Sequence, residues 1–164
     1  MKLKQILSGA AAAALLLWAG VANAALYNFT VSGDYSASWR LDSAPTPDKV
    51  SAGEGFVLWD VSGNFPGAVF GFVDLIFFHG GGGGGLQIED FSGDKVLLSS
   101  DGAQLYTGAE SQPVFKLGTF ALSEFQGGRN YTLTIAAAVP EPATRGMLLG
   151  GLALVGAAAR RRRA

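Results

Sequence analysis

The stretch YNFTVSGDYSASWRL, residues 27–41, carries the pattern that decides the fold. In residues 27–32, and again in residues 35–41, an aromatic or aliphatic side chain stands at every second position. A period of two residues is typical of β-strands that bury one face. The SGD tripeptide between the two segments is a short turn signal. The stretch therefore predicts a β-hairpin.

The residues that follow repeat short apolar segments bounded by Gly, Asp, Ser or Pro. The expected strands are FVLWDVSG, AVFGFVDLIFFH, GLQIED, KVLLSS, AQLYTG, VFKLGTFAL and YTLTIAA. About nine short strands at this spacing predict an all-β fold, a single antiparallel β-sandwich or jelly-roll-like domain. YNFTVS and YTLTIAA are expected to pair at one edge of it. The glycines at residues 80–85 are expected to form a flexible hairpin loop.

The N-terminal segment has the features of a secretory signal peptide. Lys2 and Lys4 precede an apolar run, and the small residues Ala22 and Ala24 stand at the −3 and −1 positions of a cleavage site. We expect a signal-peptide helix over residues 1–24 and cleavage by signal peptidase before Ala25.

The C-terminal segment combines a proline-rich motif, an apolar run and a basic end. The VPEPAT motif spans residues 139–144, and its core is Val139, Pro140, Glu141 and Pro142. Its prolines keep the chain extended. The uncharged residues 146–159 would make a helix about 21 Å long, which can cross a membrane if its flanks snorkel. The basic tail of residues 160–164 would hold the cytoplasmic side through Arg160, Arg161, Arg162 and Arg163.

The order of these features resembles the PEP-CTERM sorting signal of Gram-negative bacteria. The resemblance covers VPEPATRGMLLGGLALVGAAARRRR, residues 139–163. It implies recognition by an exosortase, an inner-membrane cysteine protease, followed by removal of the tail. It also implies export to the cell surface or the extracellular polysaccharide matrix. The expected organisation is a signal peptide at 1–24, an ectodomain at 25–138 and a sorting signal at 139–164.

The interior carries a second resemblance. WRLDSAPTPD, GGGLQI, QLYTGAESQPVFKLGTFAL and YTLTI resemble a recurring ectodomain of small PEP-CTERM proteins. This resemblance bears on the fold and on sorting, and it assigns no active-site residues.

Charge and composition exclude several classes of function. The whole chain has a net charge of −1, but 7 of its 12 basic residues lie in the two terminal segments. Five basic and 12 acidic residues remain in the expected ectodomain, which leaves it at about −7. Such a domain is a poor partner for nucleic acid or anionic lipid. The absence of cysteine excludes disulfides, thiolate metal sites and cysteine nucleophiles.

Candidates for catalysis are few. His79 is the single histidine, and no G-x-S-x-G motif is present. Paired carboxylates for glycoside hydrolysis remain, with Asp60, Asp74, Glu89 and Asp90 as candidates. Strand parity places Asp60 toward solvent and Trp59 on the opposite face. Asp74 lies in a strand that is apolar on both faces, so we expect a structural role for it and a pairing with Arg40.

Calcium is the one cofactor that the sequence leaves open. Glu89, Asp90 and Asp94 place three carboxylates around one turn, although solvated acidic loops would look the same. Four aromatic residues are expected in the core, with stacking on sugar rings as the alternative: Tyr35, Trp39, Trp59 and Tyr106.

These observations predict an exported, non-enzymatic protein of the surface or matrix, associated with exopolysaccharide and biofilm. A carbohydrate-binding module, with or without calcium, is the alternative, and a carboxylate-dependent glycosidase is the third reading. The expected partners are signal peptidase, exosortase, extracellular polysaccharide and, before processing, the membrane.

Overall fold

The computed structural model describes residues 25–138 of the chain. Several predictions fall outside these residues: the signal peptide with Ala22 and Ala24, the motif at 139–144, the membrane segment at 146–159 and the basic tail at 160–164. Within residues 25–138, no helix has the length and apolar character needed to cross a membrane.

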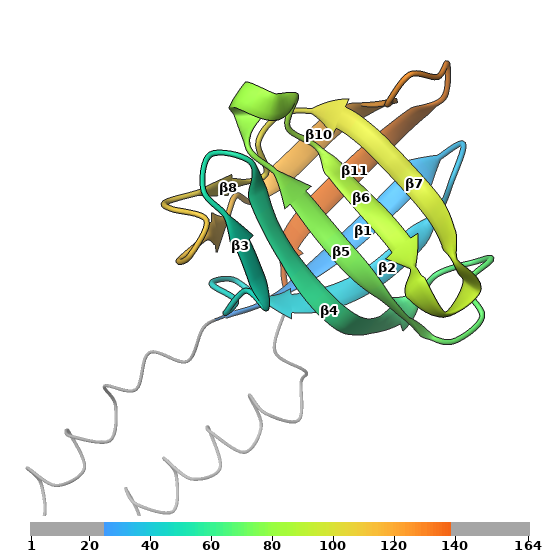
Figure 1. The fold of residues 1–164 in the computed structure, drawn as a ribbon, viewed down its shortest axis with the longest axis horizontal. Helices are drawn as coiled ribbons and strands as arrows, with labels where there is room; N and C mark the ends of the chain where they lie inside the picture. The colour runs from blue at the N-terminus through green and yellow to red at the C-terminus, as the bar shows by residue number, and fades with distance from the viewer. Residues whose placement is uncertain (1–24, 139–164) are drawn as a thin grey trace, which may run out of the picture.

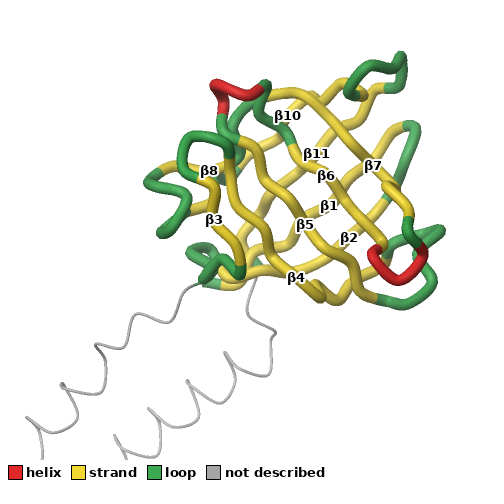
Figure 2. Tube along the Cα trace, in the orientation of Figure 1, coloured by secondary structure: helices red, strands yellow, loops and turns green. Residues whose placement is uncertain are grey.

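Eleven β-strands make up most of the described chain (Figure 1). They are β1 (Leu26–Gly33), β2 (Ala37–Asp42), β3 (Lys49–Ser51), β4 (Gly55–Asn64), β5 (Phe72–Phe78), β6 (Leu86–Asp90), β7 (Lys95–Gly102), β8 (Tyr106–Thr107), β9 (Val114–Phe115), β10 (Gly118–Glu124) and β11 (Asn130–Ala137). Two 3-10 turns, η2 (Gly80–Gly82) and η3 (Phe91–Gly93), connect β5 to β6 and β6 to β7. Figure 2 shows them in red at opposite corners of the strands.

Most of the strands form one closed antiparallel sheet. Nine strands follow the order β2-β1-β11-β10-β7-β6-β5-β4-β3, and β2 also pairs with β4. That extra pairing joins eight strands into a barrel-like ring and leaves β3 outside it, while β8 and β9 form a separate pair. The all-β, antiparallel prediction is confirmed. The predicted sandwich or jelly roll is corrected to a closed, barrel-like sheet.

The seam that closes the ring is short and depends on a glycine. Ser38 lies opposite Asn64, and Trp39 lies opposite Gly63. A Cβ at Gly63 would come within 2.6 Å of the Ser38 carbonyl oxygen and 2.8 Å of the Trp39 Cβ. Side-chain alternation predicts which face of a strand is buried, but it does not say which strand edges meet. The sandwich prediction failed for this reason.

The hairpin predicted for residues 27–41 is confirmed. β1 pairs with β2 in antiparallel fashion, with Phe29 opposite Trp39. The other side of β1 pairs with β11, and the Ala138 N–H donates to the Leu26 carbonyl at 2.8 Å. The predicted pairing of the first and last strands is therefore confirmed, although it lies within a closed sheet and not at an edge.

Aromatic and aliphatic side chains fill the inside of the ring. Phe29 stacks on Trp39 with ring centroids 5.3 Å apart, and Phe56 stacks on Phe77 at 5.1 Å. Phe115 meets Phe29 edge-on and Phe77 at a tilt, which links the two stacks. Among the described residues, the buried members of this cluster lie between positions 29 and 135. Residues 25–138 thus have a hydrophobic core of their own, the feature expected of a domain that folds as a unit.

The glycine run is packed at its C-terminal end. Gly84 and Gly85 are buried, with φ angles of 65° and 73°. Cβ atoms there would collide with the carbonyl oxygens of Gly102 and Ser100. A residue with a side chain fits neither the backbone conformation nor the space. The expectation of a flexible hairpin loop is therefore wrong for these two glycines.

Candidate functional site

The longest strand, β4, is irregular near its middle. Its pairing with β5 is regular up to Leu58 and resumes at Val61. Between these positions β4 has Trp59 and Asp60, whereas β5 has Asp74 alone. The extra residue makes a β-bulge, a feature that re-aims side chains and occurs often beside functional sites. Both side chains face outward: Trp59 is 51% exposed, and Asp60 is exposed as well.

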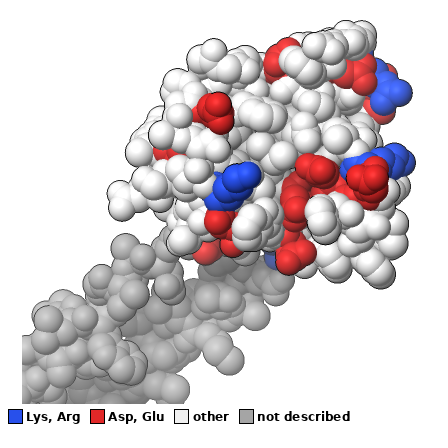
Figure 3. All heavy atoms as spheres, in the orientation of Figure 1, with Lys and Arg blue, Asp and Glu red and all other residues white. Residues whose placement is uncertain are grey.

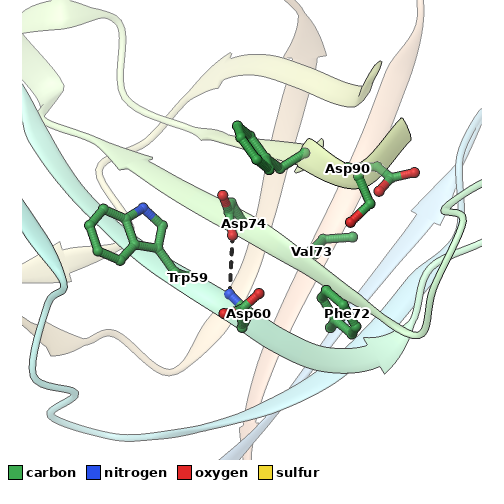
Figure 4. A pocket seen from close by; sticks show the side chains of 8 residues that line it. Trp59, Asp60, Phe72, Val73, Asp74 and Asp90 are labelled. Carbon is green, nitrogen blue, oxygen red and sulfur yellow. Dashed lines mark hydrogen bonds between the residues drawn. The ribbon is translucent and has the colours of Figure 1, made fainter. Parts of the chain in front are cut away.

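Two carboxylates hold the backbone of this bulge. Asp60 has a φ of 53°, in the left-handed region that Asp tolerates better than most residues. Its N–H donates to Oδ1 of Asp74 at 3.0 Å, the dashed line of Figure 4. The N–H of Trp59 donates to Oδ2 of Asp48 at 2.9 Å. The bulge is thus fixed by side chains from β5 and from the loop before β3.

The bulge decides three of the predictions made above. Asp60 faces solvent, as predicted, but Trp59 does too, so its assignment to the core is wrong. An extra residue shifts strand parity by one, and alternation cannot reveal it. Asp74 contacts the backbone of the bulge, and its partner is the Asp60 N–H and not the predicted Arg40. Within residues 25–138 the one ion pair joins Arg129 to Glu124, at 3.7 Å.

A third carboxylate lies close to the bulge. Asp90 ends β6 and is only 1% exposed. Its Oδ2 accepts the Val69 N–H at 2.8 Å. Figure 4 shows Asp60, Asp74 and Asp90 around one hollow, where they come from β4, β5 and the end of β6.

Exposed aromatic rings surround these carboxylates. Trp59 is joined by Phe72, which is 37% exposed, and by Phe91, which is 80% exposed. Phe70 stacks on Phe72 with ring centroids 5.5 Å apart. The hollow has a volume of about 420 Å³, within the range of small-molecule sites. We call it the aromatic-acidic cleft; its lining residues are Trp59, Asp60, Phe72, Val73, Asp74, Asp90, Phe91 and Ser92.

The lining of the cleft is acidic. Three of its eight lining residues are aspartates, and none is Lys or Arg. Glu89 adds a fourth carboxylate nearby, because it lies opposite Asp74 in the pairing of β5 with β6. Figure 3 shows a group of acidic side chains on this face of the molecule, with Lys or Arg side chains beside it. The cleft therefore combines flat apolar surfaces with hydrogen-bond acceptors and negative charge.

The three carboxylates predicted as calcium ligands do not converge. Alternation along β6 buries Asp90 and leaves Glu89 half-buried on the other face. Asp94 is exposed at the end of η3, with a φ of 48°. In the part of the chain that the structure describes, no group of three His, Asp or Glu side chains could hold a metal ion. Calcium dependence stays a prediction without a defined ligand set.

Other candidates take structural positions. His79 Nδ1 accepts the Gly81 N–H at 3.0 Å, at the start of η2. Trp39 and Tyr106 are buried, as predicted. Burial raises the pKa of Tyr106 to about 12, and the charge of Glu110, which accepts the Tyr106 hydroxyl at 3.4 Å, acts in the same direction.

Sequence reasoning missed Phe72, Phe91 and Ser92. Phe72 begins an almost wholly apolar strand, and its neighbours in sequence gave no reason to place it outside. Phe91 follows the strand end at Asp90 and precedes two turn residues, a context in which exposure is common. That context was the one available signal.

Comparison with known proteins identifies one region. Residues 138–163 match the model described as the PEP-CTERM protein-sorting motif. No curated protein and no solved structure matches the chain. The matched region begins at Ala138, directly after β11. The chain therefore carries a PEP-CTERM protein-sorting motif, the mark of exported proteins sorted by an exosortase.

Proposed function

We propose that this protein is a non-enzymatic component of the cell surface or extracellular matrix, released from the membrane by exosortase cleavage and associated with exopolysaccharide in biofilm. The observation that carries the proposal is the sorting motif that follows the last strand of a closed fold. A folded domain followed by a sorting motif is the order expected when the C-terminal segment directs export of that domain. The signal peptide of residues 1–24 and the membrane segment of residues 146–159 are parts of the same proposal.

Replacing Pro140, Glu141 and Pro142 together by alanine tests the sorting step. The intact mass of the protein would be measured in membrane and matrix fractions. We expect the wild-type product to begin at Ala25 and end near the motif, and the variant to keep its basic tail in the inner membrane. A matched control replaces the exposed Asp42 by alanine. Unchanged release of the triple variant would contradict the proposal.

The aromatic-acidic cleft favours a second function, carbohydrate binding. Aromatic faces stack on the apolar faces of sugar rings, and carboxylates accept hydrogen bonds from sugar hydroxyls. Trp59 and Phe72 offer exposed rings, and the exposed Asp60 and the half-buried Asp74 line the same cleft. A cleft of about 420 Å³ has room for part of a polysaccharide chain.

Binding would be measured as a rise in melting temperature of the 25–138 domain with matrix polysaccharide, because a ligand of the native state stabilises it. We expect Trp59→Ala to abolish the rise. Phe125→Ala is the matched control, since Phe125 is also 51% exposed and lies outside the cleft. If Trp59→Ala keeps the full rise, the cleft is not the site. Adding calcium to each titration tests the predicted calcium dependence.

A glycosidase that uses two carboxylates is the third hypothesis. Asp74 already holds the backbone of the bulge, which favours a structural part over a reacting one. Hydrolysis of matrix polysaccharide that is lost in both Asp74→Asn and Glu89→Gln would support the enzyme. Turnover that survives both changes would exclude this mechanism.

A further inference from the structure

The charge of the aromatic-acidic cleft points to one class of sugar. We propose that the cleft selects polysaccharides whose sugars carry free, protonated amino groups over neutral or acidic ones. This inference rests on the proposed carbohydrate binding and specifies its ligand.

The polar groups of the cleft that the structure places are mainly hydrogen-bond acceptors. Asp74 uses Oδ1 and Asp90 uses Oδ2 to accept backbone N–H groups. A carboxylate has two oxygens and about four acceptor positions, so the half-buried Asp74 and the exposed Asp60 retain capacity for a ligand, whereas Asp90 is almost fully buried. Among the lining side chains, Ser92 supplies a hydroxyl donor and Trp59 an indole N–H. A ligand rich in N–H donors therefore fits better than one rich in acceptors.

The electrostatics give the same preference. Three aspartates line the cleft without a lining Lys or Arg, and Glu89 lies opposite Asp74. Lys95 lies opposite Asp90 in the pairing of β6 with β7, outside the lining. The accessible carboxylates attract a bound cation and repel an anion. A uronic acid would be repelled, and a neutral N-acetylated sugar would gain no such attraction.

The aromatic rim can hold the same cation. An ammonium group within about 6 Å of a ring centre is attracted to the ring face, most strongly for tryptophan. Trp59 is placed directly beside Asp60 by the bulge, so that ring and carboxylate open to the same hollow (Figure 4). An amino sugar presents an apolar ring face for stacking and an ammonium group for the carboxylates. This combination matches both halves of the cleft.

Three oligosaccharides of equal length test the selection on the 25–138 domain. They are four-residue oligomers of β-1,4-linked glucosamine, of N-acetylglucosamine and of galacturonic acid, titrated at low and high salt. We expect the glucosamine oligomer to bind about tenfold more tightly than its N-acetylated form, the size expected from one cation–π contact and one or two exposed charge pairs. High salt should reduce the difference.

The variants Asp60→Asn and Asp74→Asn locate the effect. Asparagine at position 74 keeps an oxygen that can accept the Asp60 N–H, so it removes charge and preserves the bulge. We expect each change to lower the preference about threefold. Asp42→Asn removes the same charge from an exposed position outside the cleft and should leave the preference unchanged. Melting curves would verify that every variant is folded.

The possible outcomes distinguish failure of charge selection from failure of the proposed carbohydrate binding. Equal binding of the glucosamine and N-acetylglucosamine oligomers would overturn charge selection and leave carbohydrate binding standing. A preference that Asp42→Asn lowers as much as Asp60→Asn would assign it to the net charge of the domain and overturn the role of the cleft. Binding of none of the oligomers, or of any other matrix polysaccharide, would overturn both proposals.

Discussion

Two groups of aromatic side chains occupy opposite faces of β4 and β5. On the inner face Phe56 and Phe77 are fully packed, at 1% and 0% exposure. On the outer face Trp59 and Phe72 are 51% and 37% exposed. Phe72 and Phe77 even stand on the same strand, an odd number of residues apart. The same residue type thus serves the core at one position and an open cleft at the other.

The difference shows that the number of aromatic residues does not by itself distinguish core positions from binding-site positions. Inner rings are buried because alternation is regular around them, and their stacking with Phe115 fills the ring of strands. Phe72 is exposed because regular alternation along β5 places it on the outer face, and the bulge leaves both Trp59 and Asp60 on the outer face of β4. Contiguous exposed apolar patches are uncommon on folded domains and are a feature of interaction sites and ligand-binding grooves. The outer group therefore carries the functional argument, and the inner group carries stability.

The largest expected effect is the loss of stability when one of the buried inner rings is removed. Phe77→Ala should lower the free energy of unfolding by about 3–5 kcal/mol, because it leaves a cavity in a packed interior. Phe72→Ala on the same strand should change it by less than about 1 kcal/mol, because the ring is already partly in water. Urea denaturation of the 25–138 domain measures both. Similar losses for the two variants would mean that the outer ring is structural.

The glycine run offers a second contrast, at the connection between β5 and β6. Gly84→Ala should cost about 1–3 kcal/mol, because φ is 65° there and the added Cβ would collide with the Gly102 carbonyl oxygen. Gly82→Ala should stay within about 0.5 kcal/mol, since nothing lies within 4 Å of its Cβ position. Thermal melting of the two variants measures the difference. Equal melting temperatures would indicate that the whole run is loosely packed.

Substitutions at Asp60 test whether the backbone conformation of the bulge limits which residue can stand on the outer face. Asp60→Val should cost about 1–2 kcal/mol, because a β-branched residue disfavours the left-handed region. Asp60→Asn should be close to neutral, because asparagine tolerates that conformation. Denaturation midpoints would be compared alongside sugar binding. If the two variants are equally stable, the φ of 53° does not constrain the choice of residue at this position.

The smallest expected change in stability at neutral pH is that from Tyr106, a buried aromatic residue with a hydroxyl group. Its folded-state pKa of about 12 lies above the ordinary tyrosine value of 10.0, so the native state favours the protonated hydroxyl. The stability from this group is fully present below pH 10 and is lost as the pH rises toward 12. We expect Tyr106→Phe to flatten that part of the stability curve, measured by urea denaturation at several pH values. An unchanged slope would mean that the hydroxyl does not contribute.

Much of the fold was predictable because alternation is a local property. Residues 27–41 specify a hairpin through a pattern that any buried face requires, and the structure pairs Phe29 with Trp39 accordingly. The sorting motif is likewise a linear feature, and it was identified from its residues alone. The residues of the aromatic-acidic cleft were predictable only in part. Asp60, Asp74 and Asp90 were candidates from the sequence, whereas Phe72 and Phe91 were not.

The sequence by itself determined the strand pattern, the buried faces, the acidity of the ectodomain and the identity of the sorting motif. Only the tertiary structure decided that β2 meets β4 at Gly63 and closes the sheet, and that Trp59 and Asp60 share a cleft with Asp90. The first set depends on neighbours along the chain, whose spacing is printed in the sequence. The second depends on register between distant strands, where one extra residue in β4 reverses the direction of a side chain.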